Sequence, residues 1–143
     1  MNSKSEEKND LAVSFVIPVK NEERHIATCI NSIRRRCPAE ISYEIIVVDN
    51  GSTDSTVRIL NDLRVSNILY ASGRIGACRN TGAHVAIGKM LIFIDGDVEL
   101  THEWSAGIAA ELKRLEQEGV REISGSWYRT TMASPIERHW FEP

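Results

Sequence analysis

Three short polar segments contain residue types that could do chemistry, and each follows an apolar run. They are residues 18–22 (Pro-Val-Lys-Asn-Glu), 49–52 (Asp-Asn-Gly-Ser) and 95–97 (Asp-Gly-Asp). The carboxylates of Asp95 and Asp97 are two residues apart, so in extended backbone both could face the same crevice. Grouped carboxylates repel unless a hard cation such as Mg²⁺ or Mn²⁺ binds among them together with the oxygens of a phosphorylated substrate. The pattern indicates a divalent-metal site, although each segment alone is also typical of a turn or a helix start.

Arginine side chains could balance the negative charge of these segments. Arg74 and Arg79 flank a segment in the middle of the chain, where a guanidinium group can bind phosphate oxygens or form a surface ion pair. Gly76 and Gly82 lie in the same predicted helix, and glycine weakens a helix. The close approach of a neighbouring backbone, or packing against the sheet, would explain why they stand there. We expect Arg79 to be the arginine that faces a ligand.

The apolar runs have the length and the Val and Ile content of buried strands, and amphipathic stretches separate them. We expect strands over residues 12–19, 43–48, 66–71, 89–94 and 122–128. We expect helices from a cap at Asn21 to Arg36, from Asp54 to Leu63, from Ile75 to Ile87 ahead of Gly88, and from a cap at Thr101 to just before Gly119. This alternation predicts an α/β fold with a doubly wound, mostly parallel sheet that binds ligands at the carboxyl ends of its strands.

Length, composition and charge argue against several classes of protein. The 143 residues are 42% hydrophobic and 26% charged, as in one globular domain, and a net charge of −3 without a long basic run argues against nucleic-acid binding. No run approaches the roughly 18 apolar residues of a membrane-spanning helix, so we expect a cytoplasmic chain. Cys29, Cys37 and Cys78 lack paired spacing and predict free thiols. The glycine motifs of dinucleotide-binding oxidoreductases and P-loop NTPases are absent, and residues 20–22 stand where a nucleotidyltransferase would need a basic, glycine-rich loop.

Four motifs resemble, in content and in order, those of the inverting family 2 glycosyltransferases. They are residues 15–22, 46–54, 76–82 and 93–97. The resemblance covers about residues 13–103 and implies the Rossmann-like GT-A fold, in which the first and fourth strands lie side by side. It also implies a nucleotide-diphosphate sugar as donor, expected to be a UDP-sugar, and Mn²⁺ or Mg²⁺ as cofactor.

The resemblance implies a role for each matching residue. The residues implied to bind the nucleotide are Pro18, Val19, Glu22, Asp49, Arg79, Asp95 and Gly96. Asp49 would contact the base and Asp95 the ribose, while Asp97, with Asp95 beside it, would hold the metal that offsets charge on the departing diphosphate. Asn50 stands where the family often has a second Asp, which keeps a hydrogen-bonding side chain but removes a charge.

The general base needed for inverting transfer is not placed by these motifs, because in the family it lies downstream, in the acceptor-binding half. Glu137 and Glu142 match no motif of that base. We expect a polar, disordered tail over residues 1–10, a nucleotide-sugar-binding domain over 11–128, and a tail over 129–143 that leads into a missing acceptor-binding portion. Turnover by this chain alone is therefore expected to be near background.

An alternative is a non-catalytic module that binds a nucleotide sugar or a partner protein. Trp127, Tyr128, Trp140 and Phe141 would then pack against a partner chain, and a homodimer is one form that this packing could take. The sequence leaves the sugar and the acceptor open, whether a saccharide, a lipid-linked group or a protein. A longer protein containing this chain could act at the cytoplasmic face of a membrane.

Overall fold

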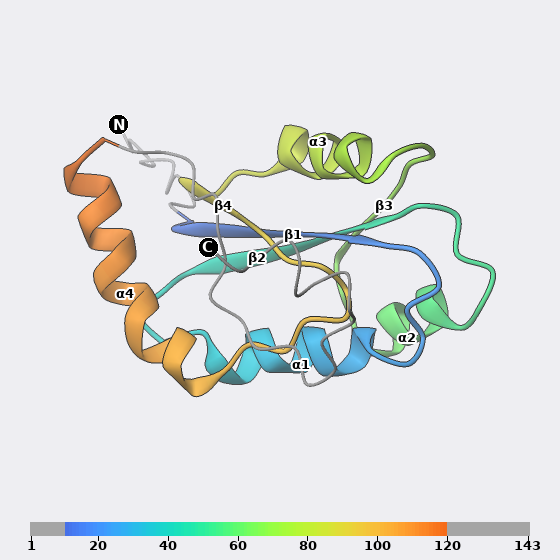
Figure 1. Cartoon of the computed structure of the whole chain (residues 1–143), viewed down its shortest axis with the longest axis horizontal. Helices are drawn as coiled ribbons and strands as arrows, with labels where there is room; N and C mark the ends of the chain where they lie inside the picture. Colours follow the sequence, from blue (N-terminus) through green and yellow to red (C-terminus); the bar gives the residue numbers. More distant parts are fainter. Residues whose placement is uncertain (1–10, 120–143) are drawn as a thin grey trace, which may run out of the picture.

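The computed structural model describes residues 11–119, which form a four-stranded parallel sheet with helices on both faces (Figure 1). In chain order the elements are β1 (Val13–Val19), α1 (Ile26–Arg36), β2 (Tyr43–Asp49), α2 (Thr56–Asp62), β3 (Asn67–Tyr70), α3 (Ile75–Val85), β4 (Met90–Phe93) and α4 (His102–Gln117). The expected α/β fold with a parallel sheet is confirmed. The strand expected over 122–128 and the aromatic residues beyond it lie outside the described residues.

The strands are ordered β3-β2-β1-β4. Strand β1 therefore lies between β2 and β4, two strands that are far from each other in the sequence. In the parallel register, Val19 lies beside Asp49 of β2, and Val16 lies beside Phe93 of β4. The backbone N–H of Ile94 donates to the carbonyl of Val16 at 3.1 Å. The carboxyl ends of the parallel strands therefore meet at one edge of the sheet, as expected, with the first and fourth strands side by side.

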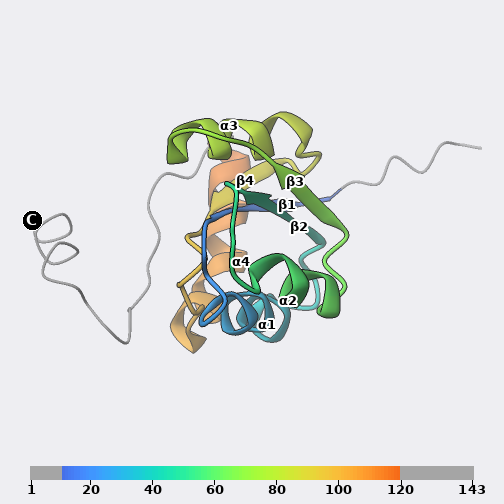
Figure 2. The same ribbon diagram turned by 90° about the vertical axis from the view of Figure 1, so that its right-hand side faces the viewer.

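Both faces of the sheet are covered, which explains why its strands are continuous apolar runs. Phe15 and Ile17 pack with α1, α2 and α4 on one face, while Val16 packs with Cys78 of α3 on the other. Figure 2 shows α3 on one side of the sheet and α1 and α2 on the opposite side. Gly82 of α3 lies against the sheet so closely that a Cβ there would collide with Val16. Packing against the sheet is therefore the reason for this helical glycine.

The first helix begins later than expected. Asn21 does not cap it, because its backbone has a φ of 55° and its side-chain oxygen accepts a hydrogen bond from the N–H of Thr53 at 2.8 Å. The α-helix starts at Ile26, and its first turn contains no acidic residue. The sequence expectation at Asn21 was wrong because a contact with another loop takes the side chain that would have capped the helix.

Helix α3 ends at Val85, two residues before the expected end. The N–H of Ile87 donates to Glu44 Oε1 at 2.8 Å, and the N–H of Gly88 donates to Ser14 Oγ at 2.9 Å. These bonds to β2 and β1 draw the chain onto the sheet and out of helical geometry.

Helix α4 has the boundaries that its sequence predicts. Thr101 Oγ1 accepts a hydrogen bond from the N–H of Trp104 at 3.4 Å, and Gly119 follows the helix with a φ of 70°. Within residues 11–119, no helix is both long enough and apolar enough to cross a membrane.

Candidate nucleotide and metal site

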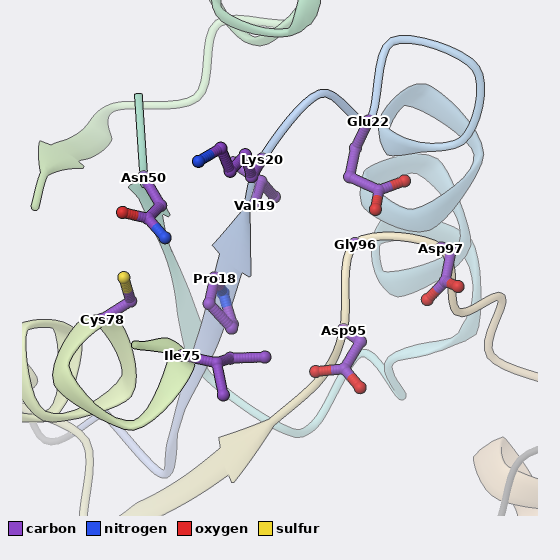
Figure 3. A pocket seen from close by; sticks show the side chains of 10 residues that line it. All are labelled: Pro18, Val19, Lys20, Glu22, Asn50, Ile75, Cys78, Asp95, Gly96 and Asp97. Carbon is purple, nitrogen blue, oxygen red and sulfur yellow. The ribbon is translucent and has the colours of Figure 1, made fainter. Parts of the chain in front are cut away.

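A cavity of about 320 Å³ lies at the carboxyl edge of the sheet (Figure 3). Its walls come from the ends of β1, β2 and β4 and from the start of α3. The residues that line it are Pro18, Val19, Lys20, Glu22, Asn50, Ile75, Cys78, Asp95, Gly96 and Asp97. In Figure 3 the carboxylates of Glu22, Asp95 and Asp97 lie toward one side of the view, and Lys20 and Asn50 toward the other. Parallel sheets of this kind bind ligands at this position.

The turn after β4 contributes Asp95, Gly96 and Asp97, and it runs directly over the end of β1. A Cβ on Gly96 would lie 2.9 Å from Val19 Cγ1 and 3.2 Å from Glu22 Cγ. Glycine is therefore required for the two loops to approach this closely. The close approach places the Asp-Gly-Asp turn beside Glu22, which is 73 residues from Asp95 in the chain.

The thiol of Cys29 lies beneath the three carboxylates and shows how closely they gather. Its Sγ donates to the carbonyl of Asp95 at 3.7 Å. Burial first, and then the charges of Asp97, Asp95 and Glu22, together raise the pKa of Cys29 to about 12. The separate acidic loops therefore create one region of negative potential at this edge of the sheet.

Arg79 partly neutralises this region. Its Nη2 donates to Asp95 Oδ1 at 2.8 Å, from a guanidinium group that is 38% exposed to a carboxylate that is 42% exposed. Within residues 11–119, Asp97 has no hydrogen-bond or ion-pair partner. Of the two carboxylates in the turn, Asp97 is thus the one left free to bind a ligand.

Hydrogen bonds between the loops after β1 and β2 hold Glu22 in place. The N–H of Glu22 donates to Thr56 Oγ1 at 2.8 Å, and the N–H of Asn21 donates to Ser52 Oγ at 2.9 Å. Asp54 accepts from the N–H of Glu23 at 3.1 Å. These contacts explain the Ser, Thr and Asp residues after β2, which join two loops rather than cap only the next helix.

Two of the expected site residues, Arg79 and Asp49, do not line the cavity. Asp49 is buried, with 2% of its surface exposed. Its two carboxylate oxygens accept from the N–H of Ser52 at 3.3 and 3.1 Å. Asn50, the next residue, reaches the cavity instead.

Four residues that line the cavity were not expected from the sequence as site residues. They are Lys20, Asn50, Ile75 and Cys78. Lys20 and Asn50 lie within two of the polar motifs, and that position was the signal that could have identified them. Ile75 and Cys78 are indistinguishable from ordinary apolar residues of an amphipathic helix.

The donor atoms at this edge fit a hard divalent cation that also binds a substrate. No group of three or more His, Cys, Asp or Glu side chains within residues 11–119 is arranged to hold a metal by itself. Mg²⁺ and similar cations commonly bind to one or two carboxylates and take their other ligands from phosphate oxygens and water. A free Asp97 beside a cavity satisfies that pattern without a complete protein cage.

Residues 14–138 match the protein family described as glycosyl transferase family 2, which covers most of the chain. The chain belongs to glycosyltransferase family 2. Among its relatives is the glycosyltransferase AglE of Haloferax volcanii, 36% identical over 120 residues, which are 80% of this chain and 36% of that protein. Another is the poly(ribitol-phosphate) beta-N-acetylglucosaminyltransferase TarS of Staphylococcus aureus, 31% identical over 103 residues, which are 68% of this chain and 18% of that protein.

Solved structures of family members share this fold. The structure of Staphylococcus aureus TarS residues 1–349 with UDP-GlcNAc superposes with a TM-score of 0.63 at 27% identity, over 74% of this chain and 32% of that one. The corresponding complex with UDP has a TM-score of 0.64 at 25% identity, over 74% and 33% of the two chains. The GT-A fold implied by the sequence motifs is thereby confirmed. The chain spans about a third of the length of AglE and of this TarS chain.

Proposed function

We propose that this chain binds the nucleotide-diphosphate part of a sugar donor, with Mn²⁺ or Mg²⁺, in the cavity at the carboxyl edge of the sheet. The observation that carries the proposal is the convergence of Glu22, Asp95 and Asp97 on one cavity, with Asp97 free of any partner among the described residues. The complexes of TarS with UDP and with UDP-GlcNAc support a UDP-sugar as the donor.

Within this proposal the nucleotide lies across the ends of β1, β2 and β4. Pro18, Val19 and Glu22 contact the nucleoside, as does Gly96 through its backbone; Asp95 approaches the ribose and Arg79 the nucleotide side of the pocket. Asp49 serves the base indirectly, because it is buried and holds the Ser52 turn beside the cavity.

Asp97, with Asp95 beside it, binds the divalent cation. A cation held there offsets the negative charge that builds on the departing diphosphate.

The reaction class that we propose for the complete enzyme is inverting sugar transfer to an acceptor hydroxyl. The hydroxyl oxygen attacks the anomeric carbon from the face opposite the leaving group, and the bond from that carbon to the diphosphate oxygen breaks. The bonding electron pair leaves with the diphosphate, while a general base takes the hydroxyl proton. The residues described here orient the donor for this attack by fixing its nucleotide end.

Calorimetry with UDP, in the presence and absence of Mn²⁺, tests the proposal. Wild-type protein should bind UDP only weakly without metal and at least about tenfold more tightly with it, as expected when a cation joins carboxylate to phosphate. Asp97→Asn should abolish this metal dependence because it removes a charged oxygen ligand. Glu99→Gln is the matched control, since Glu99 lies two residues further along and faces Arg35 at 3.6 Å, away from the cavity. If wild-type protein fails to bind UDP with Mn²⁺ present, the proposal is wrong.

We also propose that the chain works in the cytoplasm. Cys29, Cys37 and Cys78 are all free, which is typical of a reducing compartment. Recovery of the native protein in an oxidising compartment after cell fractionation would contradict this.

A further inference from the structure

The side chain of Asn50 forms two hydrogen bonds with the backbone of a single glycine. Its Nδ2 donates to the carbonyl of Gly73 at 2.9 Å, and its Oδ1 accepts from the N–H of Gly73 at 3.1 Å. The amide thus pairs with Gly73 as a strand residue pairs across a sheet, and it joins the loop after β2 to the loop after β3.

This connection lies two residues before the first residue of α3, Ile75. Gly73 has a φ of 130°, a conformation that other residues rarely adopt. Arg74 precedes the first helical residue, and no side chain caps the helix. The first turn of α3 then carries Ile75 and Cys78 into the cavity wall. The pair between Asn50 and Gly73 is therefore the side-chain contact that anchors this wall to the end of β2.

At neutral pH the amide of Asn50 can make both bonds, whereas the carboxylate of an Asp cannot. A carboxylate of the same shape could accept from the N–H of Gly73, but it has no hydrogen to donate, and its oxygen would face the carbonyl oxygen of Gly73. An apolar side chain of similar size would make neither bond. The chemistry of the pair thus distinguishes Asn from the Asp that often stands at this position in the family.

We propose that Asn50 is a positioning residue that sets the α3 wall of the donor pocket through Gly73. The part of this inference that is tested by UDP binding rests on the proposed binding of a nucleotide-diphosphate sugar. The other part, that Asn50 orders the start of α3, can be measured by hydrogen exchange without any ligand.

Two variants separate the hydrogen bonds from the change in charge. Asn50→Leu removes both bonds without adding charge, and Asn50→Asp keeps the acceptor but loses the donor. Asn80→Asp is the matched control, because Asn80 is exposed on α3, makes no side-chain hydrogen bond with the described residues 11–119 and does not line the cavity. The probes are UDP with Mn²⁺, measured by calorimetry, and residue-resolved hydrogen exchange of the Gly73 amide.

At pH 7 both Asn50 variants should bind UDP about fivefold to tenfold more weakly than wild type, as expected for the loss of one or two hydrogen bonds. The Gly73 amide should exchange faster in Asn50→Leu, and the Asn80→Asp control should match wild type in both measurements. At about pH 4, the ordinary pKa of an aspartate, the carboxyl of Asn50→Asp gains a proton to donate, so exchange of its Gly73 amide should approach that of wild type at the same pH, whereas exchange in Asn50→Leu should not. A general loss of stability would not produce this recovery.

The measurements distinguish failure of this inference from failure of the proposed function. Unchanged exchange at Gly73 in Asn50→Leu would overturn the inference, and so would wild-type affinity for UDP in that variant. If wild-type protein itself does not bind UDP, the proposed function fails, and the exchange of Gly73 alone then decides whether Asn50 positions α3.

Discussion

Arg79 on α3 and Asp95 after β4 form an ion pair at 2.8 Å that joins a helix on one face of the sheet to the acidic turn at its edge. The Nε atom of Arg79 is buried and has no hydrogen-bond partner in the described part of the chain. The pair makes Asp95 the ion-paired member of the Asp-Gly-Asp turn, whereas Asp97 has no partner within residues 11–119. The two carboxylates are therefore not equivalent, although the sequence presents them symmetrically.

Arg79→Lys tests whether this geometry matters. Lysine keeps the positive charge but lacks the planar fork of guanidinium, so we expect the affinity for UDP with Mn²⁺ to fall about tenfold. Because both partners are more than a third exposed, the free energy of unfolding should change by no more than about 1 kcal/mol. Calorimetry and urea unfolding measure the two quantities. Arg58→Lys, in the exposed pair with Asp62, is the control, and equal UDP affinity in the two variants would contradict the prediction.

Gly96→Ala should destabilise the protein because a Cβ there would lie 2.9 Å from Val19 Cγ1. We expect the free energy of unfolding to fall by about 1–3 kcal/mol, as for overpacking elsewhere in protein interiors. Gly107→Ala is a matched control, since a Cβ at that position of α4 meets nothing within 4 Å. It should stabilise the helix by about 0.5–1 kcal/mol. If Gly96→Ala were as stable as wild type in urea unfolding, the turn would not pack as described.

The carboxylate of Asp54 should make stability depend on pH in the acid range. Partial burial raises its pKa, but hydrogen bonds from the hydroxyl and N–H of Thr56 and the N–H of Glu23 outweigh this and lower the pKa below the ordinary 3.8. A lowered folded-state pKa gives a contribution that is present above 3.8 and lost as the pH falls through the folded-state value. Asp54→Asn should thus be less stable than wild type at pH 7, and in urea unfolding the two should converge as the pH falls through the folded-state pKa of Asp54. A difference that stays constant with pH would argue against this role.

Cys29 should resist alkylation in the native protein. Burial, with the charges of Asp97, Asp95 and Glu22, raises its pKa to about 12, so at pH 8 the thiol is neutral and is a poor nucleophile. Iodoacetamide labelling followed by mass spectrometry should show slower modification at Cys29 than at Cys37, which is less buried. Unfolding in urea should remove the difference, and equal rates in the native state would contradict the prediction.

Much of the sheet could be predicted from the sequence, because β-branched runs of strand length followed by polar turns are compatible with few other structures. The contact between residues 18–22 and 95–97 was predicted from the family motifs, because composition alone does not indicate that β4 pairs with β1. The expectation for Thr101 rested on a local rule and was confirmed.

The expectation at Asn21 failed because a distant partner overrides a local preference. Asn21 has the residue type of a helix cap, but Thr53, 32 residues away, takes its side chain. This partner cannot be identified by reading a window of the sequence, because the choice depends on how two loops come together in space. Asp49 is a different case, since its carboxylate accepts from the N–H of Ser52 three residues along the same loop.

The strand order affects the sequence of steps by which the nascent chain folds during synthesis. When residues 1–88 have been synthesised, β1, β2 and β3 are complete and can pair, and α3 can cover one face. The wall that carries Asp95 and Asp97 does not yet exist, because β4 must be added beside β1 across a long chain separation. Closing such a long loop is entropically costly and slow. A nascent chain should therefore acquire binding competence only when β4 has joined β1, after β1, β2 and β3 are able to pair.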